Sequence, residues 1–267
     1  MKKIFFVLIL GLAFASCEDV IDLDLDNAPP RLVIDARLEL LENGDSRNTI
    51  ELTRSSGFFE EVNPLVADAT VSITDATGTV YPFTYDPNLE LYTNTTIEIT
   101  GNVDYSLEII DGSQTYTATQ QLVRTVPLEG VEQQEITGFG DVTQITAFFT
   151  DPPSLGDNYF FTYEDEFNFE VDVSDDEFIN GNRTPTSFFM EDLEPGTNIQ
   201  LTINGIDQQA FRFFETLIQQ TDGGGGGPFD TQPATVRGNI INPANPEQFP
   251  FGYFRVSQVF ELNYVSQ

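Results

Sequence analysis

The fold is decided by the stretch from Tyr105 to Leu122, which reads YSLEIIDGSQTYTATQQL. Within it, Asp111-Gly112 separates two runs in which β-branched and aromatic residues alternate with polar ones. Alternation with a period of two is typical of a strand with one buried face, and Asp-Gly is a strong signal for a tight turn between strands. The stretch therefore predicts a β-hairpin with strands over 105–110 and 115–122.

Segments of similar composition precede this hairpin, and turn residues such as Asp75-Ala76-Thr77-Gly78 and Gly101-Asn102 separate them. We expect strands at 32–34, 49–53, 69–74, 79–85 and 95–99. No stretch in this part of the sequence has a helical period. About seven short strands joined by turns are typical of an immunoglobulin-like β-sandwich, which we predict over 31–125.

A second β-rich domain is predicted over 126–267, and it begins with a hinge from Val126-Pro127 to about Gly140. Its strands are expected at 145–150, 159–173, 199–203, 234–241 and 252–264. Consecutive apolar pairs such as Phe148-Phe149 and Phe160-Phe161 imply strands that are covered on both faces. The predicted fold class is thus mainly β, with an N-terminal immunoglobulin-like sandwich and a second β-rich domain that carries one amphipathic helix.

That helix is predicted over about 208–221. Asp207 can cap its start by accepting a backbone N–H, and Gly223 can close its end. Apolar residues share one of its faces: Ala210, Phe214, Leu217 and Ile218. We expect the helix to pack on a sheet, the alternative being a helix presented to a partner. The Gly-rich loop 223–227 that follows lacks the Lys-Ser or Lys-Thr of a phosphate-binding loop.

Residues 1–16 have the features of a secretory signal peptide, with Lys2-Lys3 before a short apolar run. About a dozen apolar residues are too few to span a hydrocarbon core of roughly 30 Å as a helix. The run ends in Ala15-Ser16-Cys17, which resembles the lipobox of bacterial lipoproteins, where the Cys is lipidated and becomes the first mature residue. Because Cys17 is the only Cys in the chain, we predict that it is lipidated.

Residues 17–30 are predicted to be an acidic tether or a first strand. The alternation in Asp22-Leu23-Asp24-Leu25-Asp26 fits a short strand. The same spacing begins a calcium-binding loop, but that loop requires Gly and Glu where this chain has Asn27 and Val33. Pro29-Pro30 ends the segment with stiff, extended backbone.

The composition excludes most catalytic chemistry. The chain has no His, and Lys2 and Lys3 in the signal peptide are its only Lys. Nucleophilic triads with His, Schiff bases and His-ligated zinc sites therefore cannot form in the mature protein. With 43 Asp and Glu, chance pairs are unavoidable, so no pair indicates a glycosidase. We predict that the protein is not an enzyme and has no cofactor.

The formal net charge is −32, and a surface this acidic repels nucleic acid. We therefore exclude nucleic acid as a partner. Within the acidic patch 164–177, Asp172, Asp175 and Asp176 are candidate calcium ligands, since Ca²⁺ takes six to eight oxygen ligands. A solvated loop between strands explains the same residues. We favour the loop interpretation and predict no metal site.

Short motifs follow one another in a definite order along the mature chain. They are Asp22–Leu25, Arg31–Ile34, Val66–Ile73, Tyr105–Ile109, Phe211–Phe214, Phe229-Asp230, Val236–Ile240 and Phe251–Ser257. Together they resemble the Bacteroidota lipoproteins grouped as domain-of-unknown-function family 4249. The resemblance implies an envelope lipoprotein and supplies no catalytic residues. It also implies a place beside a TonB-dependent outer-membrane transporter, as an accessory lid or docking subunit.

These observations predict a non-catalytic, surface-exposed outer-membrane lipoprotein that is an accessory partner of a TonB-dependent transporter. Its partners would be the outer membrane, through the lipid at Cys17, and the transporter. The alternative is a lipoprotein module that binds glycans or peptides, with ligand-binding residues that the sequence does not identify. Because sugar platforms favour Trp and the chain has none, an exposed Tyr in a cleft would be the sign of such a module.

Overall fold

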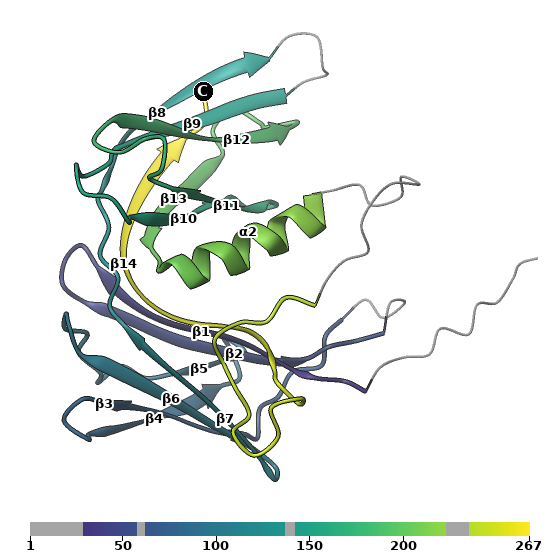
Figure 1. Cartoon of the computed structure of the whole chain (residues 1–267). Helices are drawn as coiled ribbons and strands as arrows, with labels where there is room; N and C mark the ends of the chain where they lie inside the picture. The colour runs from purple at the N-terminus through teal and green to yellow at the C-terminus, as the bar shows by residue number, and fades with distance from the viewer. Residues whose placement is uncertain (1–28, 58–61, 137–141, 223–234) are drawn as a thin grey trace, which may run out of the picture.

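The computed structural model describes residues 29–57, 62–136, 142–222 and 235–267, and these form strands and one α-helix (Figure 1). The elements in the first half are β1 Leu32–Leu41, β2 Ser46–Arg54, β3 Thr70–Asp75, β4 Val80–Asp86, β5 Leu91–Thr93, β6 Asp104–Asp111 and β7 Gln114–Gln121. Those in the second half are β8 Leu128–Ile136, β9 Val142–Thr150, β10 Asn158–Glu164, β11 Phe169–Asp175, β12 Arg183–Glu191, β13 Asn198–Gly205, α2 Gln208–Asp222 and β14 Phe251–Val265. The mainly β fold class is confirmed.

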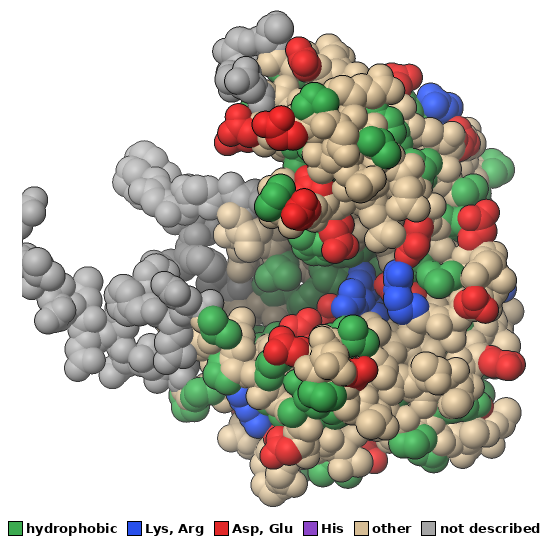
Figure 2. Space-filling model, turned by 180° about the vertical axis from the view of Figure 1, so that it is seen from behind, with side chains coloured by type: hydrophobic (Ala, Val, Ile, Leu, Met, Phe, Trp, Pro, Cys, Tyr) green, Lys and Arg blue, Asp and Glu red, His purple; other side chains and the backbone are tan. Residues whose placement is uncertain are grey.

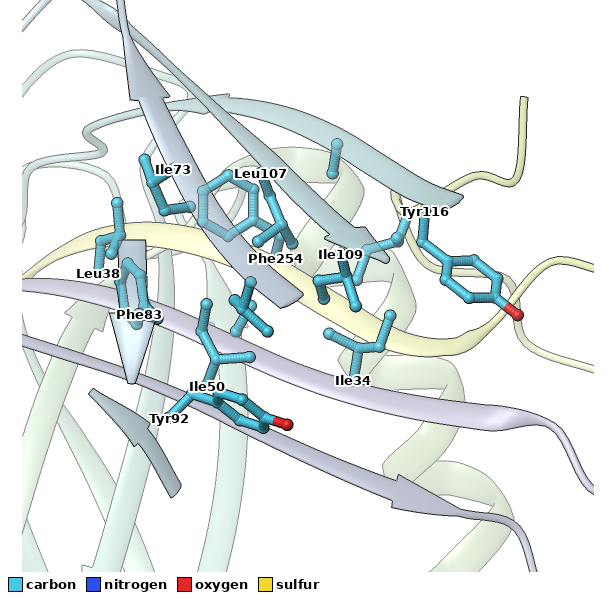
Figure 3. Packing of buried hydrophobic residues seen from close by; sticks show 14 of the residues in the cluster. Ile34, Leu38, Ile50, Ile73, Phe83, Tyr92, Leu107, Ile109, Tyr116 and Phe254 are labelled. Carbon is cyan, nitrogen blue, oxygen red and sulfur yellow. The ribbon is translucent and has the colours of Figure 1, made fainter. Parts of the chain in front are cut away.

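The described strands form two sheets. The larger has 11 strands in the order β11-β10-β13-β14-β1-β2-β5-β4-β3-β6-β7, and the smaller has the order β12-β9-β8. Strand β4 pairs with β3 over 80–83 and with β5 over 84–86. Because β4 joins the two parts in this way, the large sheet bends back on itself and encloses a core between β1-β2-β14 and β3-β6-β7 (Figure 3).

This first core is the interior of the predicted sandwich. Its fully buried side chains come from both layers: Ile34, Leu38, Ile50, Ile73, Leu107, Ile109 and Phe254 (Figure 3). The predicted hairpin is confirmed, since β6 and β7 pair in register and Asp111 lies opposite Gln114 across the turn. Gly112 has a φ of +57°, a conformation that costs Gly nothing. The immunoglobulin-like arrangement is therefore present in the N-terminal half.

A second core lies between the small sheet and strands β10 and β13. It contains mostly aromatic and aliphatic side chains: Ile145, Phe149, Tyr159, Phe161, Tyr163, Phe188, Leu201 and Ile203. The predicted hinge over 126–140 is wrong, because Leu128–Ile136 forms β8, an edge strand that pairs with β9. This edge strand lies at the surface and only one of its faces is covered, so its sequence is rich in Glu and Gln. The alternation of apolar and polar residues that would predict a strand is therefore weak.

Strand β14 connects the two halves. Its first part pairs in parallel with β1, from Val33↔Phe251 to Leu41↔Val259. Its last part pairs antiparallel with β13, up to Asn198↔Val265. The C-terminal strand therefore contributes to both cores, and in Figure 1 it curves through the whole molecule. Gly252 allows β14 to lie this close to β1. Its φ is +98°, and a Cβ at this position would lie 1.9 Å from the Ile34 carbonyl oxygen.

Several sequence predictions fall on residues outside the described ranges. They are the signal peptide 1–16, Cys17, nearly all of the tether 17–30 and the Gly-rich loop 223–227. Within the described ranges, no helix has both the length and the apolar character needed to cross a membrane.

Candidate functional site

A groove of about 810 Å³ lies between helix α2 and the face of the large sheet formed by β1, β10, β13 and β14. Its lining includes Asp35, Arg37, Glu39, Arg47, Phe160, Glu164, Thr202, Phe213, Phe214, Leu217, Ile218 and Arg255. Figure 2 shows this hollow between the two halves of the molecule, with hydrophobic side chains inside it and cationic ones at its edge. We call it the groove.

Strand alternation explains why polar side chains face the groove. Along β1, Ile34, Ala36 and Leu38 are fully buried in the first core, so the intervening Asp35, Arg37 and Glu39 point to the opposite face. The same holds on β14, where Phe254 and Val256 face the core and Tyr253 and Arg255 face the groove. Arg37 lies opposite Arg255 in the register of these two neighbouring strands.

Helix α2 forms the other wall of the groove. It packs against β10 and β11, with Ala210 and Phe213 buried beside Phe160 and Tyr253. The sequence prediction that the helix packs on a sheet is therefore confirmed. Towards the C-terminal end of α2 the packing is looser, and Leu217 is 41% exposed although it lines the groove. An apolar strip of the helix thus remains accessible from the groove.

Asp207 fixes the start of the helix. One carboxylate oxygen accepts a hydrogen bond from the backbone N–H of Ala210 at 2.7 Å, the arrangement of an N-cap. The same carboxylate accepts hydrogen bonds from the Gln120 side chain at 2.7 Å and from the Tyr253 hydroxyl at 3.1 Å. Burial raises the pKa of Tyr253, and the charge of Asp207 adds to the effect. Asp207 therefore connects α2 to strands β7 and β14.

Arg255 is the most unusual side chain of the groove. It is 8% exposed, and its Nε and Nη1 atoms are buried without a hydrogen-bond partner among the described residues. The guanidinium carbon lies 4.6 Å from the centre of the Phe160 ring and 5.7 Å from that of Phe214. Burial lowers the pKa of Arg255, while the charges of Asp35 and Glu39 act in the opposite direction. Since Arg stays charged in proteins, the groove contains a buried cation.

The other two Arg of the groove are paired with carboxylates. Arg47 contacts Glu39 at 2.6 Å and Glu261 at 2.7 Å. Arg37 Nε lies 3.4 Å from the carboxylate of Asp35, within ion-pair distance although it forms no hydrogen bond among the described residues. These two ion pairs engage two of the three carboxylates that line the groove, Asp35 and Glu39.

A separate group of carboxylates lies at one end of the second half. The carboxylate oxygens of Asp151, Asp157 and Asp176 are within 4.8 Å of one another. Burial raises the pKa of Asp157, and the charges of Asp151 and Asp176 raise it further. Of the candidate calcium ligands, Asp176 belongs to this group, whereas Asp172 and Asp175 lie on β11 and are not part of it.

Protein donors already engage these carboxylates. The Asp176 carboxylate accepts hydrogen bonds from the backbone N–H of Gly156 at 2.7 Å and of Asp157 at 3.2 Å. The Asp151 carboxylate accepts one from Gly181 N–H at 2.9 Å and one from the Tyr159 hydroxyl. These contacts hold the loop before β10 against the turn after β11, so a structural role explains the group. The Pro-Pro and Gly-Asp turn signals over 151–157 mark this loop in the sequence but do not show that it meets Asp176.

The family model described as Domain of unknown function (DUF4249) matches residues 18–263. No curated protein matches the chain. Among solved structures, a cytokine receptor complex is similar with 14% identity, 66% of this chain and 86% of that chain covered, and a TM-score of 0.25. A segment of two fibronectin type III domains from chicken tenascin is similar with 15% identity, coverages of 67% and 91%, and a TM-score of 0.21. The chicken interferon gamma receptor alpha chain is similar with 9% identity, coverages of 68% and 91%, and a TM-score of 0.21.

Proposed function

We propose that this chain, which belongs to the DUF4249 family, is a non-catalytic lipoprotein of the cell envelope that binds a ligand in the groove. The observation that carries the proposal is the groove itself, which combines an accessible apolar strip of α2 with an unpaired, buried Arg255. Ligand sites are typically concave, mostly apolar and provided with a few placed polar groups. The absence of His, and of Lys outside residues 2 and 3, supports a function without catalysis.

The membrane attachment in this proposal depends on Cys17. Lipidation there, together with the tether 18–30, would hold the folded body near the outer membrane at a distance of up to about 45 Å, at roughly 3.3–3.6 Å per extended residue. One acyl chain gives only marginal membrane binding, whereas several chains on one residue hold a protein firmly. The acidic start, Glu18-Asp19, supports display at the cell surface.

The attachment is tested by Cys17→Ser in the native host. We expect the variant to move from the membrane fraction to a fraction released without detergent. Ser16→Ala, which keeps a small residue before the Cys, is the matched control and should stay in the membrane fraction. Unchanged membrane retention of Cys17→Ser would refute lipidation as the means of attachment.

We further propose that the partner of this lipoprotein is a TonB-dependent transporter of the outer membrane. The order of motifs along the chain and the lipobox support this assignment. Purification of the tagged protein under mild detergent should retrieve a β-barrel transporter, identified by mass spectrometry. Repeated recovery of the lipoprotein alone, from cells that express it at its normal level, would argue against the partnership.

The alternative of a glycan-binding module has less support. Sugar platforms need an exposed aromatic face, and the only Tyr that lines the groove, Tyr253, is 2% exposed. Phe160 and Phe213 are likewise buried, and the lining aromatic that is exposed is Phe169, at 61%, whose ring carries no hydroxyl group. The groove is better suited to an apolar ligand, including an apolar peptide, than to a sugar.

A further inference from the structure

We propose that the groove takes a ligand in which a single carboxylate is attached to an apolar body, and that the guanidinium of Arg255 receives the carboxylate. This inference rests on the proposed binding function and names its ligand class. Three features of the groove carry it: the unpaired cation, the charge balance of the lining, and the apolar wall formed by α2.

The unpaired cation comes first. A guanidinium has five N–H donors, and an uncompensated charge inside a protein is strongly unfavourable. Arg255 is more than nine-tenths buried, yet its Nε and Nη1 have no hydrogen-bond acceptor among the described residues. Stacking on Phe160 and Phe214 favours the cation but supplies no acceptor for its N–H groups. A ligand oxygen in the groove would supply one.

The carboxylates of the protein do not take this role. Asp35 is 3.4 Å from Arg37, and Glu39 is 2.6 Å from Arg47. Both carboxylates attract Arg255 electrostatically, but neither forms a hydrogen bond with it. Because Asp35 and Glu39 contact other Arg side chains, the N–H groups of Arg255 can be satisfied by an acceptor from outside the chain.

The charge balance of the groove also favours one negative charge and no more. The chain has a formal net charge of −32, yet the groove is lined by three Arg and three carboxylates, counting Glu164. The groove is thus nearly neutral within a strongly acidic protein. A phosphate monoester, with about two negative charges, would meet a single free cation next to Asp35 and Glu39. A carboxylate matches that one cation.

The apolar wall accounts for the rest of the ligand. Phe214, Leu217 and Ile218 of α2 line the groove together with Val171 of β11. Leu217 is among the exposed large hydrophobic residues, so covering it would remove apolar surface from water. The volume of about 810 Å³ lies in the range of sites for small organic ligands.

Isothermal titration calorimetry on the purified full-length protein tests the proposal with three probes of equal chain length. They are octanoate and octylammonium, below their micellar concentrations, and 1-octanol, below its solubility limit. We expect octanoate to bind at least tenfold more tightly than octanol. Equal affinity for octanol, or tighter binding of octylammonium, would overturn the assignment of a carboxylate while leaving the groove as a binding site.

The role of Arg255 is tested by Arg255→Met, with Arg183→Met as the matched control on an exposed Arg of β12. We expect Arg255→Met to lose the preference for octanoate over octanol by tenfold or more and to keep its affinity for octanol. Arg183→Met should behave like the natural protein. Arg255→Lys, which keeps a cation, should retain part of the preference. An unchanged preference in folded Arg255→Met would refute the role of Arg255.

The source of the carboxylate is distinguished by a second pair of probes. N-acetyl-Leu-Phe with a free C-terminal carboxylate is compared with its amide, to separate a peptide end from an alkyl acid. Preference for the free acid over the amide supports the proposal and places peptides in the ligand class. If the free peptide acid and octanoate both fail to bind, the proposal is wrong, whatever the co-purification with a transporter shows.

Discussion

The guanidinium of Arg255 lies over the ring of Phe160, with 4.6 Å between its carbon and the ring centre. The two residues are on β14 and β10, which are separated in the large sheet by β13. The contact keeps this buried cation in place between the sheet and helix α2, where Phe214 lies 5.7 Å from the same guanidinium. Replacing Arg255 by an apolar residue should therefore weaken the binding of anions without a large loss of stability.

Replacement of Arg255 by Met should not destabilise the protein by more than about 2 kcal/mol. Exchanging buried ionic groups for well-packed apolar ones is often neutral or stabilising by about 1–4 kcal/mol. Loss of the cation–π contact offsets this by roughly 0.5–2 kcal/mol. We therefore expect the free energy of unfolding in urea, without ligand, to lie between about 2 kcal/mol below and about 3.5 kcal/mol above that of the natural protein. A loss of more than about 2 kcal/mol would mean that the guanidinium is satisfied within the protein and needs no ligand.

The cap of helix α2 offers a second prediction. Asp207→Ala removes the acceptor for the Ala210 N–H and for the side chains of Gln120 and Tyr253. Loss of a cap alone costs about 0.5–2 kcal/mol, and the stranded partners add to it. We expect the free energy of unfolding to fall by about 2–3 kcal/mol.

Asp207→Asn is the matched control for this change. It keeps an acceptor oxygen at the N-cap and should lose clearly less stability than Asp207→Ala, by urea unfolding under the same conditions. Equal losses in both variants would show that the charge of Asp207, and not its hydrogen bonding to the helix start, holds α2 in place.

The buried tyrosines predict how stability depends on pH. Burial raises the pKa of Tyr159, Tyr163 and Tyr253 above the usual value of 10.0, and hydrogen bonds to carboxylates add to the shift in each case. A group whose pKa is raised on folding contributes fully below its unfolded pKa, and its contribution is lost as the pH rises above that value. We expect the urea midpoint to hold up to about pH 10 and to fall steadily beyond it.

Tyr159→Phe tests the contribution of a single hydroxyl. The variant cannot ionise at this position, so its urea midpoint should fall less steeply above pH 10 than that of the natural protein. The loss of the hydrogen bond to Asp151 should lower its stability at neutral pH. Identical slopes above pH 10 in the two proteins would contradict the assignment of a raised pKa to Tyr159.

The local elements could be predicted from the sequence because their signals are local. The Asp111-Gly112 turn placed β6 and β7, and Asp207 with the apolar face placed α2 within one residue of its observed bounds. The sequence predicts one strand over 159–173, whereas the structure has two, because Asp165 accepts hydrogen bonds from the backbone N–H groups of Phe167 and Asn168 and closes a turn. Residues 95–99 carry a strand composition but form no strand, although Ile97 is buried in the first core.

The pairing of β14 with β1 could not be predicted from local patterns. These strands are about 218 positions apart, and no turn residue specifies their parallel register. The predicted boundary between residues 125 and 126 therefore places β14 in the second domain only. In the structure, the first nine residues of β14 pair with β1 and belong to the sheet of the N-terminal half. The pairing depends instead on tertiary packing, because β14 places side chains in both cores.

The groove could not be predicted from the sequence either, because it is formed by segments that are far apart in the chain. Its residues come from β1, β2, β5, β10, β11, β13, α2 and β14. Arg255 is unusual because two of its nitrogens are buried without a hydrogen-bond partner among the described residues, which only tertiary structure reveals. One signal was available in the sequence: Arg255 stands within Phe251–Phe260, a ten-residue stretch that has no other charged residue. A charged residue inside such a strand is a sign of a buried cation.

The most direct measurement is a crystal structure of the protein grown with octanoate. We predict a carboxylate oxygen about 2.7–2.9 Å from a guanidinium nitrogen of Arg255, with the alkyl chain against Phe214 and Leu217. Octanoate that binds in the groove with its carboxylate turned away from Arg255, or that binds only elsewhere on the protein, would contradict the role given to this residue.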